Sequence, residues 1–212
     1  FKKLGTEDRI KEFKSHYNSA DEKTKEFLLF MGSMPSSSKK ELIVNIDNNY
    51  NKIQNLIDAY KKLVPKGYLV YIEFQPGNNV ISTQASVDMR IQYYNPDNFN
   101  SLETDQQWNM GYDSAELKRM CSRLNWTDET LKTIKQLLDQ ANCISIENDT
   151  IPEIGFSRSS MAKYSYLIFE QNLDKAKIDK YNNGCTYIYY KRNIVLEYRG
   201  GAVGPQCFPK ED

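Results

Sequence analysis

The amino-acid sequence predicts an α+β fold, in which a mainly antiparallel sheet of two hairpins and additional strands packs against a long N-terminal helix and a central helix pair. Apolar residues recur at helical spacing in the first third of the chain and again near its middle. Alternating apolar and polar residues mark a hairpin between these regions and four or five short strands towards the C-terminus. Strands joined by short turns and grouped apart from helices are typical of such a fold.

The long N-terminal helix is predicted from its capping signals and its apolar stripe. Ser38 and Glu41 form a capping box at its start, and Pro65 and Gly67 end it. The stripe is expected to pack on the following sheet, and a partner-helix surface is the alternative. It consists of Leu42, Ile46, Tyr50, Ile53, Ile57, Tyr60 and Val64.

A β-hairpin is the next predicted element. Residues 68–75 and 80–94 flank the turn-forming sequence Pro76-Gly-Asn-Asn79. In the register that pairs Gln75 with Val80, one face of the hairpin is almost wholly apolar and the other is polar. The polar face is therefore expected to point away from the core.

The middle of the chain is predicted to be a loop followed by two helices. Residues 95–111 are polar and rich in Asn and Asp, which favours a loop. Asp113 and Glu116 form a second capping box, and Thr127 caps the next helix. These two helices are the central pair of the predicted fold.

The last third of the chain is predicted to be a series of strands that ends in a second hairpin. The turn of this hairpin is expected at Arg192 and Asn193. Tyr187 then shares a face with Leu196 and Tyr198. The strands before the hairpin are expected at residues 143–147, 153–158 and 163–170.

Length, composition and charge exclude several classes of protein. The chain has 212 residues, and we predict a single domain over residues 1–212; if the chain divides, its halves are residues 1–96 and 112–212, joined by the polar loop. The 28 basic residues balance 28 acidic ones, which argues against a nucleic-acid binder that follows phosphates with clustered Lys and Arg. No apolar run approaches the roughly 20 residues of a transmembrane helix.

The four cysteines predict one candidate disulfide and no metal site. Cys185 and Cys207 bracket the second hairpin and a glycine-rich turn, so a disulfide between them is feasible; four reduced thiols are the alternative. Cys121 shares a helical stripe with Leu117, which suits a buried free thiol. A structural zinc site is not expected, because the chain has no C-x-x-C pair and His16 is its only histidine.

Motifs for catalysis or cofactor binding are weak. Residues Gly155 to Ser159 are similar to a nucleophile elbow, but Ser159 replaces the last glycine. The glycine-rich residues 200–204 precede no helix that could hold a phosphate, so no cofactor is expected. Glu73 and Glu197 remain as candidate catalytic carboxylates, and a glycosidase would need them roughly 5 to 10 Å apart.

A binding surface is the interpretation that the sequence favours over catalysis. Tyr and Arg are frequent at the energetic centres of interfaces, because they combine a large contact area with directional hydrogen-bond donors. A charge-paired sheet face without a ligand is the alternative. The candidate binding residues are Tyr71, Glu73, Arg90, Arg158, Tyr190, Glu197 and Arg199.

Three segments of the second half carry a resemblance. They are Gly155-Phe-Ser-Arg-Ser-Ser-Met-Ala-Lys-Tyr164, Gly184-Cys-Thr-Tyr187 and Val195-Leu-Glu-Tyr-Arg-Gly-Gly-Ala-Val-Gly-Pro-Gln-Cys-Phe208. Together they resemble an uncharacterised family of bacterial proteins that are often exported or lipid-anchored. The resemblance covers about residues 115–208, assigns no activity and no catalytic residue, and implies an extracytoplasmic location, which would favour disulfides.

The leading hypothesis is therefore an extracytoplasmic binding module, in the periplasm or cell envelope, that engages a protein or small-molecule ligand through a polar sheet face. The chain begins at Phe1 without a methionine, which fits a removed export signal and a lipid anchor upstream, or a trimmed tag. A cytoplasmic location is the alternative. Two rival functions are a glycosidase-like hydrolase that uses a carboxylate pair and an immunity-type protein that blocks a toxin.

Overall fold

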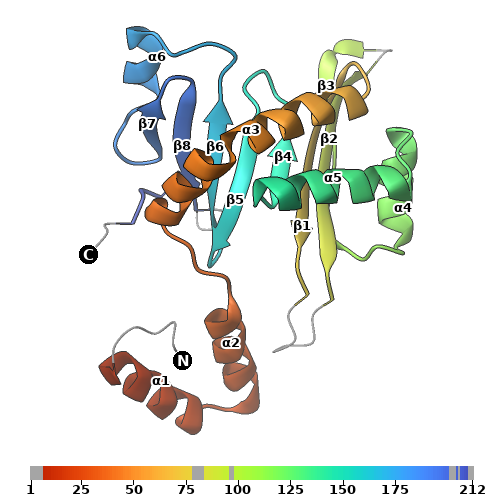
Figure 1. Ribbon diagram of the computed structural model, residues 1–212. Helices are drawn as coiled ribbons and strands as arrows, with labels where there is room; N and C mark the ends of the chain where they lie inside the picture. Colours follow the sequence, from red (N-terminus) through yellow and green to blue (C-terminus); the bar gives the residue numbers. More distant parts are fainter. Residues whose placement is uncertain (1–6, 78–83, 96–97, 201–203, 205, 210–212) are drawn as a thin grey trace.

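A computed structural model gives the architecture of the chain (Figure 1). It describes residues 7–77, 84–95, 98–200, 204 and 206–209. Within these residues, six helices accompany eight strands, and the strands form one antiparallel sheet in the order β3-β2-β1-β4-β5-β6-β8-β7. The predicted α+β fold with a mainly antiparallel sheet is confirmed.

Groups of helices and groups of strands follow one another along the chain. The helices are α1 (Glu7–Ser19), α2 (Glu22–Ser33), α3 (Lys39–Leu63), α4 (Ala115–Arg123), α5 (Asp128–Ala141) and α6 (Lys175–Lys180). The strands are β1 (Tyr68–Gln75), β2 (Ser86–Asn95), β3 (Asn98–Met110), β4 (Ser145–Glu147), β5 (Glu153–Ser159), β6 (Ala162–Ile168), β7 (Tyr187–Lys191) and β8 (Ile194–Arg199).

Helices α3 and α5 lie across one face of the sheet, and α4 packs at its β2–β3 end (Figure 1). The predicted capping box is present: Ser38 Oγ accepts a hydrogen bond from the Glu41 amide at 3.2 Å, and the Glu41 carboxylate accepts one from the Ser38 amide at 2.9 Å. Leu42, Ile46 and Ile53 of α3 are fully buried. The main hydrophobic core therefore lies between this helical layer and the sheet.

The caps of the central helix pair are confirmed for α5 and corrected for α4. Thr127 caps α5 by accepting a hydrogen bond from the Thr130 amide at 3.3 Å. The N-cap of α4 is Ser114 rather than Asp113, and its Oγ accepts a hydrogen bond from the Leu117 amide at 3.2 Å. Asp113 stands one residue too early, because an N-cap side chain reaches an amide two or three residues ahead.

The first hairpin is confirmed, but its register differs from the predicted one. Gln75 pairs with Ser86, six residues beyond the predicted partner Val80, which itself lies outside the described residues. A shift by an even number of residues keeps every side chain on its predicted face. The observed register also brings large, fully buried side chains of β2 to the core, namely Val87, Met89 and Ile91.

Strand β3 occupies residues 98–110, where the sequence predicts a polar loop. It pairs with β2 at the edge of the sheet, and its residues Leu102 and Trp108 are exposed. An edge strand with polar residues on both faces lacks the alternation that marks a half-buried strand, so the sequence pattern misses it. Because β1 also pairs with β4, one continuous sheet includes strands of both candidate halves.

The second hairpin is confirmed, but the predicted faces of its first strand are wrong. Tyr187 pairs with Glu197 and Tyr189 with Val195, whereas Lys191 pairs with Ile194. The irregularity between Tyr189 and Lys191 moves the pairing by one residue. A shift of one residue exchanges the two faces, so the side chain of Tyr187 lies with that of Glu197 and not with that of Tyr198.

A second, smaller apolar cluster lies on the face of the sheet opposite α3 and α5, at the end formed by β6, β8 and β7. Leu167 of β6 and Val195 of β8 are buried there against Leu173 and Phe169. Ile178 of α6 and a group of tyrosines pack against this cluster. The α6 segment therefore covers the β6–β8–β7 end of this face, and none of the other helices that the structure describes lies over its centre (Figure 1).

Helices α1 and α2 pack on each other and lie apart from α3 and α5 (Figure 1). None of their described side chains is buried, and Phe27 is 59% exposed. The connection to the sheet begins at Pro35, whose carbonyl accepts a hydrogen bond from the Ser160 amide at 2.8 Å. None of the helices that the structure describes is both long enough and apolar enough to span a bilayer.

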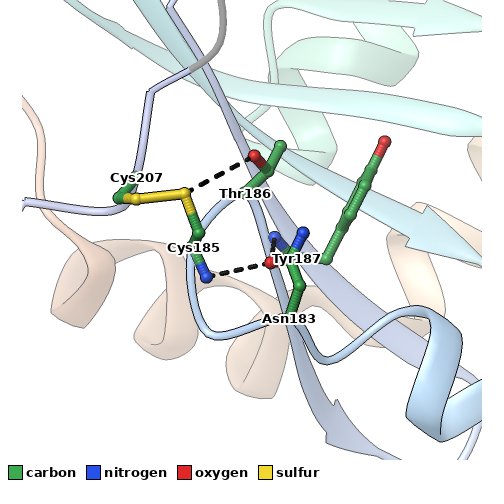
Figure 2. The surroundings of a disulfide bond; sticks show 5 residues. All are labelled: Asn183, Cys185, Thr186, Tyr187 and Cys207. Atoms are coloured by element: carbon green, nitrogen blue, oxygen red, sulfur yellow. Dashed lines mark hydrogen bonds between the residues drawn. A yellow bond between two sulfur atoms is a disulfide. The ribbon is translucent and has the colours of Figure 1, made fainter.

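A disulfide joins Cys185 to Cys207, the candidate pair of the sequence analysis (Figure 2). It fastens the C-terminal segment beside the start of β7, where the Phe208 amide donates a hydrogen bond to the Cys185 carbonyl at 2.9 Å. Phe208 is buried in the main core. Cys121 is a buried free thiol, as the sequence predicts, and Cys143 is a second one.

Candidate functional site

The face of the sheet opposite α3 and α5 carries a row of polar residues at its centre, and we refer to this surface as the open face. Register partners on neighbouring strands form the row, and beyond Glu73 and Glu197 it continues to Asp88 on β2 and to Tyr187 on β7. The carboxylates of Glu73 and Glu197 are almost completely buried. In strand order, the row consists of Asp88, Glu73, Ser145, Gly155, Ser165, Glu197 and Tyr187.

Ion pairs connect the carboxylates of the open face into one chain across the sheet. Lys163 lies between Glu73 and Glu153, and Arg199 lies between Glu153 and Glu197, so each of these three carboxylates contacts at least one cation. The contacts are Arg158 Nε to Glu73 Oε1 at 2.6 Å, Lys163 Nζ to Glu73 Oε2 at 3.8 Å and to Glu153 Oε1 at 3.1 Å, Arg199 Nη2 to Glu153 Oε2 at 2.9 Å, and Arg199 Nε to Glu197 Oε1 at 2.7 Å.

Lys163 lies at the centre of this chain and crosses Gly155. Its Nζ donates hydrogen bonds to Ser145 Oγ and to the Tyr71 hydroxyl, both at 3.3 Å, and lies 4.7 Å from the centroid of the Tyr71 ring. A Cβ on Gly155 would lie 2.1 Å from Ser145 Oγ and 3.1 Å from Lys163 Cδ. The missing side chain at this position therefore makes room for the Ser145 side chain first and for the Lys163 stem second.

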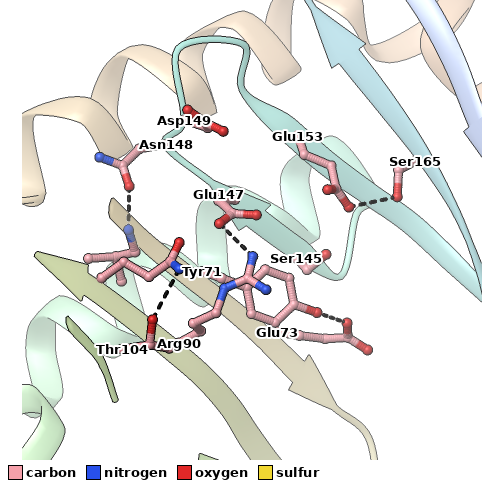
Figure 3. Close-up of polar contacts among 12 residues, drawn as sticks. Tyr71, Glu73, Arg90, Thr104, Ser145, Glu147, Asn148, Asp149, Glu153 and Ser165 are labelled. Carbon is pink, nitrogen blue, oxygen red and sulfur yellow. Dashed lines mark hydrogen bonds and ion pairs between the residues drawn. The ribbon is translucent and has the colours of Figure 1, made fainter. Parts of the chain in front are cut away.

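Tyr71 links the ion-pair chain to a second pair on β2 and β4 (Figure 3). Its hydroxyl donates a short hydrogen bond to Glu73. Arg90 Nη2 contacts Glu147 Oε1 at 2.7 Å, and the Arg90 guanidinium lies 5.7 Å from the centroid of the Tyr71 ring. Burial raises the pKa of Tyr71 to about 12, so the hydroxyl remains a donor at neutral pH.

Burial and ion pairing act in opposite directions on the charged groups of the chain. Burial lowers the pKa of Lys163, but its attraction to carboxylates such as Glu153 outweighs burial and raises it. Burial likewise raises the pKa of Glu153, and Lys163 and Arg199 together lower it below its ordinary value. The pKa of Glu197 is raised, because burial and repulsion by Glu153 outweigh the attraction of Arg199.

An open pocket of about 510 Å³ lies above these ion pairs. Trp108 and Met161, which are 48% and 42% exposed, contribute apolar surface to its lining. The Trp108 ring meets the Tyr71 ring edge-on, with centroids 6.3 Å apart. The volume is within the range of small-molecule sites, roughly 300 to 1,000 Å³.

Two β-bulges bring side chains to this pocket. In β3, the bulge near Asn109 keeps Trp108 on the open face and lets Met110 enter the core, although two residues apart normally share a face. In β5, the pairing shifts between Gly155 and Ser157, and the shift places Arg158 on the open face beside Lys163. Bulges are frequent beside functional sites, where they re-aim a side chain.

The charges at the pocket form two layers. The carboxylates of Glu73, Glu153 and Glu197 are 1%, 5% and 0% exposed. The guanidinium-bearing side chains above them are more exposed, at 30% for Arg90, 29% for Arg158 and 47% for Arg199. The surface that a ligand meets is therefore richer in cations than the total charge of the site suggests.

Five of the seven predicted binding residues line this pocket or its floor. Tyr71, Arg90, Arg158 and Arg199 line it, and Glu73 lies beneath. Glu197 is buried at the end of the ion-pair chain. Tyr190 is not part of the site, because its hydroxyl donates a hydrogen bond to Asp47 Oδ2 of α3 at 2.8 Å. The irregular pairing between Tyr189 and Lys191 in β7 puts the Tyr190 side chain on the α3 side of the sheet rather than on the open face.

The two candidate catalytic carboxylates lie on strands that are four steps apart in the sheet, β1 and β8. At about 4.8 Å per step, Glu73 and Glu197 are separated by roughly 19 Å along the row. Each is also held by a guanidinium group. This arrangement does not provide the carboxyl spacing of a glycosidase.

Sequence reasoning missed Lys163, Glu153, Glu147 and Trp108. Lys163 was recognisable in principle, because it alternates with the buried Tyr164 on a strand. Trp108 lies in the strand that the sequence pattern presents as a loop. Within the described residues, His, Cys, Asp and Glu side chains form no cluster that could hold a metal ion. No protein-family model, curated protein or solved structure matches the chain.

Proposed function

We propose that this protein is a binding module that takes its ligand in the pocket of the open face. One observation carries the proposal: most of the residues that line an open pocket at the centre of the sheet are charged, and Trp108 and Met161 add apolar surface beside them. Replacing buried ion pairs by packed apolar residues is often neutral or stabilising, so stability alone is a weak reason for such a network. The charged residues of the pocket and its floor are Glu73, Asp88, Arg90, Glu147, Glu153, Arg158, Lys163, Glu197 and Arg199.

The ordering of the side chains supports the same proposal. The ion pairs hold Arg90 and Arg158 in position before a ligand arrives. These side chains therefore lose less conformational entropy when the ligand binds. Trp108 and Tyr71 add aromatic surface beside these cations. Aromatic and arginine side chains are the residues that most often dominate binding energy.

The proposal is tested by mapping where small molecules bind. A chemically diverse fragment set is added to nitrogen-labelled protein, and the shifted amide signals are assigned to the structure. Hits are expected on the open face around Tyr71 and Arg158. The matched control site is the groove of about 540 Å³ between α3 and α5, lined by Asp58 and Leu137 among others. Hits concentrated in that groove, or absent from the open face, would contradict the proposal.

We further propose that the protein works outside the cytoplasm, in the periplasm or cell envelope. The disulfide between Cys185 and Cys207 supports this location, because disulfides persist in oxidising compartments and are rare in the cytosol. Fractionation of cells that express the full-length gene provides the test. The protein is expected in the extracytoplasmic fraction with the disulfide formed, and recovery from the cytosol with four reduced thiols would contradict the location.

A further inference from the structure

The geometry points to an oxyanion-bearing ligand, a carboxylate or a phosphate on an apolar or aromatic body, that binds the outward side of Arg158 and packs against Trp108. This inference rests on the proposed function and adds the chemical class of the ligand. It follows from the hydrogen bonds that the pocket arginines leave unused and from the surface beside them.

Arg158 has hydrogen-bond donors to spare. Its Nε donates to Glu73 at 2.6 Å, and its two Nη groups make no hydrogen bond to any residue that the structure describes. Arg90 is similar, because among the described residues only its Nη2 donates a hydrogen bond to a carboxylate, that of Glu147. A guanidinium group presents its donors in a planar fork, which fits the two oxygens of a carboxylate or phosphate.

The carboxylates of the site cannot compete for the same ligand. Glu73 and Glu153 lie beneath the cations and are already paired with Arg158, Lys163 and Arg199. The two other carboxylates of the lining are also buried and have partners: Glu147 pairs with Arg90, and Asp88 accepts hydrogen bonds from Gln75 and from the Asn109 amide. A cationic ligand would therefore meet guanidinium groups before it reached a carboxylate. An oxyanion meets partly desolvated donors, for which charge-assisted hydrogen bonds are the strong ones.

The apolar part of the ligand has a surface of its own. Trp108 is 48% exposed in the lining, and Met161 is 42% exposed. Exposed aromatic surface beside a cation favours a ring or another flat apolar group. The pocket of about 510 Å³ has room for such a group together with its anion.

The experiment compares four probes of similar shape: benzoate, phenyl phosphate, the neutral benzamide and the cationic benzylammonium ion. The chain has only two tryptophans, so its two indole N–H signals in the nuclear magnetic resonance spectrum can be told apart. Trp108 reports on the pocket. Trp126 is buried and donates its indole N–H to the Leu63 carbonyl at 2.8 Å, so it serves as the internal reference.

Benzoate or phenyl phosphate is expected to shift the Trp108 signal, with an affinity at least about tenfold higher than that of benzamide or benzylammonium. The arm that binds more tightly distinguishes a carboxylate from a phosphate ligand. Equal or tighter binding of benzamide or benzylammonium would overturn the ligand class and leave the pocket as a binding site. A Trp108 signal that no probe shifts would overturn the proposed function as well.

Two variants locate the anion. Arg158→Gln is expected to raise the dissociation constant of the preferred anion at least about tenfold. Arg158→Lys keeps the charge beside Glu73 but loses the fork, and the same weakening is expected. Arg119→Gln is the matched control, because Arg119 pairs with Asp105 on the α4 side of the sheet. Unchanged affinity in the Arg158→Lys protein, measured where it is folded, would overturn the role of Arg158.

Discussion

At the scale of single residues, the open face depends on the path of Lys163 over Gly155. The lysine contacts Ser145, Tyr71 and Glu153 from there. A Cβ at Gly155 would lie only 2.1 Å from Ser145 Oγ and 3.1 Å from Lys163 Cδ, so both side chains use the space that glycine leaves. Replacing a glycine within a strand by alanine normally favours folding, because alanine loses less backbone entropy. At Gly155 an alanine side chain would clash with its neighbours, so here the substitution is expected to lower the free energy of unfolding.

Gly155→Ala is therefore expected to destabilise the protein by about 1–3 kcal/mol, the usual cost of overpacking. The measurement is urea denaturation. Gly111→Ala is the matched control, since a Cβ at Gly111 meets nothing within 4 Å. The control should change the free energy of unfolding by less than about 0.5 kcal/mol. If Gly155→Ala is as stable as the control, Ser145 and Lys163 do not need this space.

The two ends of the Glu153–Arg199–Glu197 bridge are expected to respond to mutation with opposite signs. The pKa of Glu153 is lowered from its ordinary value of 4.5, so its ionised form stabilises the fold above that pH. Glu153→Gln should cost about 3–5 kcal/mol at neutral pH, because it leaves Lys163 without its closest carboxylate. The difference from wild type should shrink as the pH falls below 4.5 and through the lower pKa of the folded state.

Glu197 provides the comparison, because its pKa is raised from 4.5 by burial and by repulsion from Glu153. Its ionised form opposes folding above that pH, so Glu197→Gln should stabilise the protein at neutral pH. This gain should disappear as the pH falls to 4.5. Denaturation curves of both variants over a pH series provide the measurement. A loss of stability in both at neutral pH would contradict the assignment of Glu197.

At the scale of elements, the sequence predicts regular segments well and irregular ones poorly. The capping box of Ser38 and Glu41 and the stripe of α3 are local patterns, and both are confirmed. The bulge near Asn109 in β3 cannot be recognised from the local sequence, because a bulge interrupts the two-residue alternation by which strands are predicted. Tyr190 is a second example: one irregular pairing in β7 puts its side chain on the opposite face from the one that regular alternation predicts.

The candidate site was predictable only in part for the same reason. Tyr71 and Glu73 lie on a regular strand, so alternation placed them on the polar face. Arg158 reaches that face through the β5 bulge, and its contact with Glu73 joins residues 85 positions apart. Such contacts depend on the order of the strands in the sheet, and the alternation of apolar and polar residues within single strands does not specify that order.

The disulfide is the element-scale feature with the clearest effect on stability. It closes a loop with a sequence separation of 22 residues, and cross-linking a loop of that length stabilises a fold by about 3 kcal/mol. It also holds Phe208 against Tyr164 and Tyr198, with ring centroids 5.9 and 5.6 Å away. The C-terminal segment should loosen without it.

The double variant Cys185→Ser/Cys207→Ser is therefore expected to lose about 3 kcal/mol of stability. A reducing agent should lower the stability of wild type to the same level and leave the double variant unchanged, because Cys121 and Cys143 are free thiols. A thiol reagent should titrate two cysteines of the unfolded, unreduced protein. Titration of four would show that the disulfide does not form.

At the scale of the whole molecule, the helices are distributed unevenly over the two faces of the sheet. Helices α3, α4 and α5 occupy one face, and α6 covers only one end of the other (Figure 1). The remaining area carries the ion pairs and the pocket. Helices α1 and α2 add no buried side chain among their described residues to either layer.

Deletion of residues 1–33 should therefore leave the sheet and its helical layer folded. The truncated chain would begin at Met34 and keep the Pro35–Ser160 hydrogen bond. We expect its free energy of unfolding to change by less than about 1 kcal/mol, because surface segments contribute little to stability. Urea denaturation of the truncated and complete chains makes the comparison. An unfolded or strongly destabilised product would show that α1 and α2 belong to the core.

The central claim is that the open face holds a ligand through its outward guanidinium groups. The most direct test is a crystal structure of the protein with benzoate or phenyl phosphate, whichever binds more tightly, at a concentration that saturates the protein in solution. We predict an oxygen of its anionic group within hydrogen-bonding distance of an Arg158 Nη atom and a ring beside Trp108. A probe bound only in the groove between α3 and α5, or an open face that stays empty, would contradict the claim.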